Sequence, residues 1–406
     1  MRANPVRSRL AILVVACLTA AVAACGGGAE GGDGSGPIVI GTSLPLTGQF
    51  SQPGEEAKRG YEIWRDMVNG QGGLLGRQVE LRITDDASNQ DTIVADYTKL
   101  ITQEKVDLLL GSFSSLLNFA ASAVAEKNRM LFVEPAGGAP NMFSRGFKML
   151  FFAQPATAPH HADGIVEWIK SLPAADKPAT AAYLTQDDPF TRPAIESLQQ
   201  QLEQAGVRTV YTTIYPANTA NFQPVASAVA AAKPDLVGHG AQFEDGIGAA
   251  RALQQVGFSP KVFFQTNAPG FGKQYTDGIG ASNTEGVFYS TSWSENASTP
   301  LNAEFSAEYR KRHGSEPTED AADGFAAAQV LQAAVSAVGK IDQVALADWL
   351  RGNQVQTILG TLRWAETGEP QSAFMLGQWQ NGKVEIVAPK EAATTDKIVF
   401  PKPAWR

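Results

Sequence analysis

The stretch from residue 37 to residue 50 reads PIVIGTSLPLTGQF and joins a short apolar run to a loop rich in Pro, Thr and Gly. Ile38, Val39 and Ile40 are typical of a buried strand. Patterns for amphipathic helices and further strands follow in alternation, at 55–69, 78–83, 91–103, 106–110, 116–127 and 130–133. This alternation predicts a parallel sheet with helices on both faces.

The same alternation resumes further along the chain and predicts a second sheet. Strand patterns occur at 179–184, 207–214, 235–238 and 261–264, with helix patterns between them at 194–205, 222–232 and 246–256. Helices are then expected at 301–312 and 321–337, and strands at 356–363, 374–380 and 383–387. Asn381-Gly382 between the last two strands is a strong hairpin signal. The predicted fold class is α/β, with two doubly wound parallel-sheet lobes.

Composition is consistent with two lobes and excludes some partners. The 406 residues are 44% hydrophobic, which is enough for more than one core. The formal net charge is -8, whereas a nucleic-acid-binding protein would need a basic surface. Of the two cysteines, Cys17 falls in the apolar N-terminal run, so we expect no intramolecular disulfide in the mature protein.

The N-terminus has the layout of an export signal. Three arginines precede an apolar run at 10–24. A helix that crosses a membrane needs about 20 apolar residues, so this run is too short and has the layout of a signal peptide. The run ends in Val22-Ala23-Ala24-Cys25, which is similar to the bacterial lipobox. We expect a signal peptide at 1–24, lipidation of Cys25 and a flexible Gly-rich linker at 25–37. The alternative is an ordinary secretory signal in which Cys25 has no role.

Motifs for catalysis and metal binding are weak. The segment 111–115 lacks the Gly-x-Ser-x-Gly elbow of a serine nucleophile. His160, His161 and Asp163 could together hold a metal, but adjacent side chains on a helix point apart, which argues against this site. Gly238-His239-Gly240 lacks the third Gly of a dinucleotide fingerprint. We therefore expect no catalytic residues, no metal and no cofactor.

Three loops of the first lobe are expected at one edge of its sheet. They are the segments 44–50, 111–115 and 135–140, each of which follows a predicted strand. Ligands of open parallel sheets bind beyond the carboxyl ends of the strands. The second loop precedes a helix, whose N-terminus favours an anion such as a carboxylate. Glycines in the third loop let backbone amides approach a ligand closely.

The order and spacing of several segments resemble the branched-chain amino-acid-binding family, the solute receptors of ABC importers. The matching segments are 38–48, 69–77, 111–115, 134–136, 144–147 and 360–364, with Gly368. The resemblance covers residues 38 to about 390. It implies the periplasmic binding protein fold of the first type, in which a three-strand hinge joins two lobes that close on a ligand in the cleft between them. Lobe 1 would comprise 38–157 and 290–370, and lobe 2 would comprise 158–289 and 371–406.

The resemblance also implies a set of ligand-binding residues. Ser115 would bind the ligand carboxylate, and Ala136 and Gly138 would bind the head group. Phe190 and Gln242 fall at aromatic positions of the family. The full predicted set is Phe50, Ser114, Ser115, Ala136, Gly137, Gly138, Phe190, Gln242, Thr266 and Asn267.

Because the sequence departs from the family pattern at several positions, it does not identify the ligand. Gly138 replaces a Thr, and Gln242 replaces a Tyr. Thr266-Asn267 replaces the Glu that pairs with an α-ammonium group, and a buried ammonium without a counter-charge is costly. Acids that are candidates to replace this Glu are Asp187, Asp188, Glu244 and Asp245.

The expected function is that of an exported receptor, lipid-anchored at the outer face of the cell membrane or in the periplasm. It would capture a small organic solute, such as a branched-chain amino acid, and deliver it to ABC permease membrane subunits as a monomer. One alternative is the same role for a small carboxylate, amide or aromatic compound. Others are a sensory ligand-binding protein and an enzyme. The missing nucleophile and base count against the enzyme, and the lack of a second uninterrupted apolar run counts against a one-chain membrane sensor.

Overall fold

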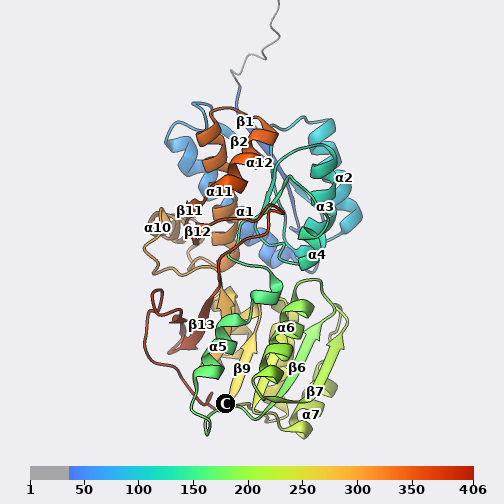
Figure 1. The fold of residues 1–406 in the computed structure, drawn as a ribbon, viewed down its shortest axis with the longest axis vertical. Coiled ribbons are helices and arrows are strands. Elements are labelled where there is room, and N and C mark those ends of the chain that lie inside the picture. Colours follow the sequence, from blue (N-terminus) through green and yellow to red (C-terminus); the bar gives the residue numbers. More distant parts are fainter. Residues whose placement is uncertain (1–35) are drawn as a thin grey trace, which may run out of the picture. The chain divides into compact units, whose positions relative to one another are not determined.

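The computed structural model describes residues 36–406 as one unit that contains two lobes (Figure 1). The predicted signal peptide, Cys25 and the linker up to residue 35 lie outside the described residues. Figure 1 shows α1, α2, α3, α11 and α12 in one lobe and α5, α6 and α7 in the other. We refer to them as lobe 1 and lobe 2.

The sheet of lobe 1 has five parallel strands in the order β2-β1-β3-β4-β5. These strands are β1 (Ile38–Leu44), β2 (Val79–Asp85), β3 (Leu108–Leu110), β4 (Phe132–Glu134) and β5 (Leu150–Phe152). The helices between them are α1 (Ser51–Gly70), α2 (Gln90–Thr102), α3 (Ser115–Lys127) and α4 (Pro140–Phe143). Strand β1 lies inside the sheet, between β2 and β3, and this order confirms the doubly wound sheet that the sequence predicts.

Alternating side chains of these strands form a core on each face of the sheet. Leu108 and Leu110 belong to a buried cluster with Trp64 of α1. Leu109 points to the other face and belongs to a cluster with Tyr97 of α2 and helix α3. Successive residues of a strand face opposite sides, so this short run of leucines serves both cores.

The sheet of lobe 2 has seven strands in the order β14-β13-β10-β9-β8-β6-β7. Its strands are β6 (Thr180–Gln186), β7 (Arg208–Tyr215), β8 (Leu236–Gly240), β9 (Val262–Gln265), β10 (Val287–Thr291), β13 (Met375–Gln380) and β14 (Lys383–Ala388). Its helices are α5 (Asp163–Ser171), α6 (Thr191–Gln204), α7 (Gln223–Ala232), α8 (Phe243–Gln255) and α9 (Lys273–Ile279), with short 3-10 turns at Ala158–His160, Ala268–Phe271 and Ala281–Asn283.

The last two strands of this sheet form the predicted hairpin and are antiparallel. The turn residues Asn381 and Gly382 have φ of 53° and 80°. Positive φ at both positions is what the favoured two-residue hairpin turn requires. The hairpin therefore adds two antiparallel strands to a sheet that is otherwise parallel.

The chain passes between the lobes three times, as the predicted three-strand hinge requires. It leaves lobe 1 after β5 and returns after β10 to α10 (Asn302–His313), α11 (Glu319–Val338) and α12 (Gln343–Gly352). It leaves again after β12 (Gly360–Leu362) to enter β13. The lobe boundaries proposed at 157/158, 289/290 and 370/371 stay a prediction.

The prediction of one strand at 356–363 is wrong. The segment forms two antiparallel strands, β11 (Val355–Thr357) and β12, joined by a tight turn. Gly360 has φ of 95°, a conformation that interrupts an extended strand. Ile358 in the turn is fully buried, and its backbone N–H donates to Gln329 Oε1 (2.8 Å). An apolar residue at a buried turn made the pattern look continuous.

Helix α11 is central to lobe 1 and packs on α1. The helix is long and apolar enough to cross a membrane, although polar residues interrupt its apolar sequence. Of its most apolar 18-residue stretch, 72% is buried inside the protein, as in a core helix. A Cβ atom on Gly60 of α1 would lie 2.0 Å from the Ala321 carbonyl oxygen. A Cβ atom on Gly324 would lie 2.6 Å from the Ala57 carbonyl oxygen. The close packing of the two helices therefore requires glycine at both positions.

We expect Gly60→Ala to lower the free energy of unfolding by about 1–3 kcal/mol, because the added methyl group forces the helices apart. The measurement is urea unfolding followed by circular dichroism. Gly70→Ala at the end of the same helix is the matched control, since a Cβ there would have no atom within 4 Å. If the two variants were equally stable, the close contact would not limit the packing.

Candidate functional site

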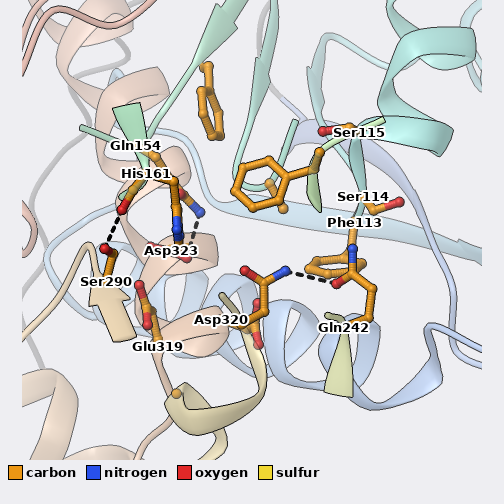
Figure 2. A pocket seen from close by; sticks show the side chains of 15 residues that line it. Phe113, Ser114, Ser115, Gln154, His161, Gln242, Ser290, Glu319, Asp320 and Asp323 are labelled. Atoms are coloured by element: carbon orange, nitrogen blue, oxygen red, sulfur yellow. Dashed lines mark hydrogen bonds between the residues drawn. The ribbon is translucent and has the colours of Figure 1, made fainter. Parts of the chain in front are cut away.

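A pocket lies where the loops after β3 and β4 meet residues of lobe 2 (Figure 2). Its cavity volume is about 50 Å³. A closed apolar cavity that binds benzene measures about 150 Å³, so this cavity is too small for a ligand of that size. The lining residues are Phe113, Ser114, Ser115, Ala136, Phe152, Gln154, His161, Phe190, Gln242, Asn267, Gly270, Ser290, Glu319, Asp320 and Asp323.

The structure brings six of the predicted residues together at this pocket. They are Ser114, Ser115, Ala136, Phe190, Gln242 and Asn267. The first three lie at the carboxyl ends of β3 and β4, and the others belong to lobe 2. Asn267 Nδ2 donates to Gln242 Oε1 (2.9 Å), which joins two of the lobe 2 residues (Figure 2). Their role in ligand binding stays a prediction.

The other four predicted residues do not line the pocket. Phe50 packs behind it against Phe113, with ring centroids 5.7 Å apart. Gly137 and Gly138 pack closely against Glu134 and Phe190, respectively. Thr266 is fully buried, and its hydroxyl bonds to the backbone N–H and C=O of Ala241. All four residues therefore lie behind the pocket wall, where they pack against other residues and do not face the cavity.

The N-terminus of α3 forms one side of the pocket. Ser114 is the N-cap residue, but its side chain makes no capping hydrogen bond. Its hydroxyl oxygen is buried without a hydrogen-bond partner among the described residues. The Ser115 hydroxyl accepts a hydrogen bond from the Ala139 N–H (3.1 Å), which ties this loop to the loop after β4. A buried hydroxyl beside the free N–H groups of a helix start can bind a carboxylate.

A buried carboxyl group that the sequence analysis missed holds these two loops in place. Glu134 Oε2 accepts from Asn118 Nδ2 (3.1 Å) and from the Ala136 N–H (2.8 Å). Asn118 also exchanges hydrogen bonds with the backbone of Ser112. Burial raises the pKa of Glu134 well above its ordinary value, although the backbone N–H groups of Ala136 and Gly137 act in the opposite direction. A glutamate at the end of an apolar strand gives no sequence signal of this role.

Three acids of α11 form the opposite side of the pocket (Figure 2). Asp323 accepts from Gln154 Nε2 (2.7 Å) and from the Ser292 hydroxyl (2.6 Å). Glu319 Oε1 accepts from the Ser292 N–H (2.6 Å) and hydroxyl (2.9 Å). Asp320 is half-buried, and no hydrogen bond joins its carboxylate to another described residue.

Burial is the main cause of raised pKa values in this acidic group. It raises the pKa of Glu319 to about 7. The pKa values of Asp320 and Asp323 lie well above the ordinary value of 3.8, because burial and the charge of Glu319 both disfavour ionisation. No Lys or Arg of the described chain forms a salt bridge with any of the three. No pattern in the sequence marks these three acids as a group.

The acids that the sequence analysis suggested in place of the family's Glu lie elsewhere. Asp188 accepts from the N–H groups of Phe190 and Thr191, both at 2.9 Å, and so caps α6. Asp187 is exposed and pairs with Arg192. Asp245 is buried and accepts from the Tyr215 hydroxyl (2.6 Å). Glu244 is exposed, and none of the four lines the pocket.

The two adjacent histidines have different surroundings. His160 is on the surface, where its Nδ1 lies 2.9 Å from Asp163 Oδ2. His161 lines the pocket, and its buried Nδ1 has no partner among the described residues. Burial lowers the pKa of His161 to about 3, so its ring is neutral. Within residues 36–406, no group of three or more His, Cys, Asp or Glu side chains could hold a metal ion.

Comparisons with known proteins agree with this architecture. The family model described as "Periplasmic binding protein" matches residues 37–383. Leu/Ile/Val-binding protein homolog 7 of Brucella abortus (strain 2308) is 26% identical over 377 residues, covering 89% of this chain and 94% of the relative.

Two solved structures share the fold. The leucine-binding protein LivK of Thermotoga maritima has a TM-score of 0.77 at 20% identity, covering 86% of this chain and 98% of LivK. An ABC transporter solute-binding protein of R. palustris in complex with benzoate also has a TM-score of 0.77, at 18% identity, covering 89% of this chain and all of that chain (100%). Leucine, for which the first protein is named, carries an ammonium group, whereas the benzoate bound to the second does not.

The crowded acids should destabilise the ligand-free protein, and Asp320→Asn tests this. The folded state raises the pKa of Asp320 above its unfolded value, so folding binds protons and stability falls as pH rises above about 3.8. Removing this charge should stabilise the fold by about 1 kcal/mol, discounted for partial exposure, or about 2 °C in Tm. We expect a larger gain at pH 8 than at pH 5 in thermal unfolding.

The matched control is Glu316→Gln, an exposed acid just before α11 that lies outside the pocket. It should leave Tm within about 1 °C at both pH values. A lower Tm for Asp320→Asn at pH 8 would contradict the repulsion within the acidic group.

Proposed function

The chain belongs to the periplasmic binding protein family, and we propose that it is the extracytoplasmic solute-binding receptor of an ABC importer. It would capture a small organic solute between its lobes and deliver it to the membrane subunits of a permease. The observation that carries this proposal is the inter-lobe pocket, whose wall at the N-terminus of α3 includes Ser114, a residue with a buried hydroxyl that has no partner among the described residues.

The proposed ligand is a small molecule with a carboxylate and an apolar body. The start of α3 and the Ser114 hydroxyl would receive the carboxylate. Phe113, Phe152 and Phe190 line the same pocket and would contact the apolar body. A relative named for Leu, Ile and Val binding and a structure that holds benzoate both fit this description.

Ligand entry would require the lobes to move apart. The cavity of about 50 Å³ is smaller than a benzene-sized ligand needs. Three crossings between the lobes form a hinge of the kind that allows opening and closure around a solute. Gln242, Asn267 and Phe190 of lobe 2 would then close over a ligand already bound to lobe 1.

Export and lipid anchoring belong to the same proposal. The apolar run at 10–24 would direct export, and acylated Cys25 would hold the receptor at the outer face of the membrane. The segment up to residue 37 would act as a flexible tether between the anchor and lobe 1. We propose that the receptor acts as a monomer beside its permease.

A role in binding rather than in catalysis fits the pocket. Within the described chain, no hydrogen bond joins a pocket serine to the imidazole ring of His161, the one histidine that lines the pocket; the Ser290 hydroxyl donates to its backbone carbonyl oxygen instead. A serine nucleophile would need such a base. Members of the family found here are named as binding proteins.

We expect Ser114→Ala to weaken binding of the best-binding carboxylate by about 1–3 kcal/mol, because the ligand loses a buried hydrogen-bond partner. The ligand is chosen by a thermal-shift screen of amino acids and plain carboxylic acids, and titration calorimetry then gives the affinity. Ser144→Ala is the control, since Ser144 is exposed and its hydroxyl bonds only to the nearby Asn141 carbonyl. Unchanged affinity for Ser114→Ala would remove this hydroxyl from the site.

We expect Cys25→Ala to move the protein from the membrane fraction to the soluble extracytoplasmic fraction without loss of ligand binding. The change removes the thiol that would carry the lipid but leaves residues 36–406 intact. Fractionation of cells and calorimetry on the released protein check the two parts. Retention of the variant in the membrane fraction would contradict the lipid anchor.

A further inference from the structure

The charged side chains of the pocket all have the same sign. The 15 lining residues include Glu319, Asp320 and Asp323 and contain no Lys or Arg. His161, which also lines the pocket, is neutral at pH 7 because burial lowers its pKa to about 3. Three acidic side chains therefore share a partly dehydrated space, and no Lys or Arg of the described chain forms a salt bridge with them.

The protein's own hydrogen bonds satisfy these acids unequally. Asp323 uses both carboxylate oxygens, one for Gln154 and one for Ser292. Glu319 uses Oε1 for Ser292, which leaves Oε2 as a free acceptor. Neither oxygen of Asp320 accepts a hydrogen bond from another described residue. The free acceptors of the group are therefore concentrated on Glu319 and Asp320, which are adjacent in the first turn of α11.

A purely structural explanation covers only part of this arrangement. Acids in the first turn of a helix interact favourably with the helix dipole, by about 0.3–1 kcal/mol each. Thr318 already caps α11 by accepting from the Ala321 N–H (3.3 Å). The dipole does not explain why a third acid, Asp323, faces the same space, or why none of the three has a basic partner.

Independent observations on the pocket wall indicate a ligand. His161 Nδ1 and the Ser114 hydroxyl oxygen are buried without hydrogen-bond partners. These residues are 4% and 2% exposed, and both line the pocket. Figure 2 shows His161 on the side of the acids and Ser114 on the opposite side. Buried polar atoms in native proteins nearly always have partners, so a polar ligand that spans the pocket would complete both.

We propose that Glu319 and Asp320 form a subsite for a positively charged nitrogen of the ligand, an ammonium or a guanidinium group. The inference rests on the receptor function proposed above. The nitrogen donates hydrogen bonds to the free carboxylate oxygens and supplies the missing counter-charge. The acidic partner of the ligand nitrogen is thus on α11 of lobe 1. In the family pattern this partner is the Glu of lobe 2 that Thr266-Asn267 replaces in this chain. Compounds that carry only a carboxylate lack this interaction.

A matched set of compounds tests the subsite. Leucine, 4-methylpentanoate, 3-methylbutylamine and 4-methylpentanamide share one apolar body and differ in their charged groups. Phenylalanine, 3-phenylpropanoate and 2-phenylethylamine repeat the comparison with an aromatic body. We expect at least one compound with an ammonium group to raise Tm, and its uncharged or carboxylate-only counterparts to have no comparable effect.

Variants of Glu319 and Asp320 then test whether these two side chains cause the preference for ammonium compounds. Asp320→Asn, and Glu319→Gln as a second variant, should raise the Kd of the best ammonium compound about tenfold or more, since a charge-assisted hydrogen bond is lost. They should also reduce its preference over the matched carboxylate, which a general loss of structure would not do. Glu316→Gln, outside the pocket, should leave both values unchanged.

Two results would overturn the subsite. One is binding of a carboxylate or amide at least as tight as that of its ammonium counterpart, which leaves the receptor function intact. The other is an unchanged preference in both Asp320→Asn and Glu319→Gln. Failure of every compound to bind would count against the subsite and the receptor function together.

Discussion

The close contact between α1 and α11 is the constraint on which the pocket depends. Gly60 and Gly324 let the two backbones meet, and the buried residues of α11 then fix the whole helix in lobe 1. Its first turns consequently cannot move away from the space beside β3 and β4. Glu319, Asp320 and Asp323 are held close together although like charges repel. The fold accepts this cost, as proteins commonly do at sites that bind a ligand.

Both polar ends of the pocket belong to lobe 1. The start of α3 offers N–H groups and a free hydroxyl, and the start of α11 offers carboxylates. Lobe 2 contributes Phe190, Gln242 and Asn267, which carry no charge. In the proposed mechanism the ligand binds lobe 1 through its charges, and closure of lobe 2 then removes water from the apolar body. Electrostatics would select the ligand, and hydrophobic burial would stabilise the closed state.

Much of the fold could be predicted from the sequence, because parallel strands and amphipathic helices leave periodic patterns. Strands β5 and β10 were not predicted because they are short and buried on both faces, and β11 and β12 were predicted as one strand because a buried apolar turn separates them. The short amphipathic helices α5 and α12 were also not predicted. Ser114, Ser115 and Ala136 could be placed because loops after adjacent parallel strands meet at one sheet edge. The acids of α11 could not, since they lie about 200 residues further along the chain and look like ordinary acids at a helix start.

In the proposed complex, a ligand bridges the two helix starts of lobe 1 in the pocket. The most direct measurement is a crystal structure of the protein with the ammonium compound that binds most tightly. We expect the ligand nitrogen within about 3 Å of an Asp320 or Glu319 oxygen, with the opposite end of the ligand at Ser114. A nitrogen bound instead to residues of lobe 2, with Asp320 and Glu319 left in water, would contradict it.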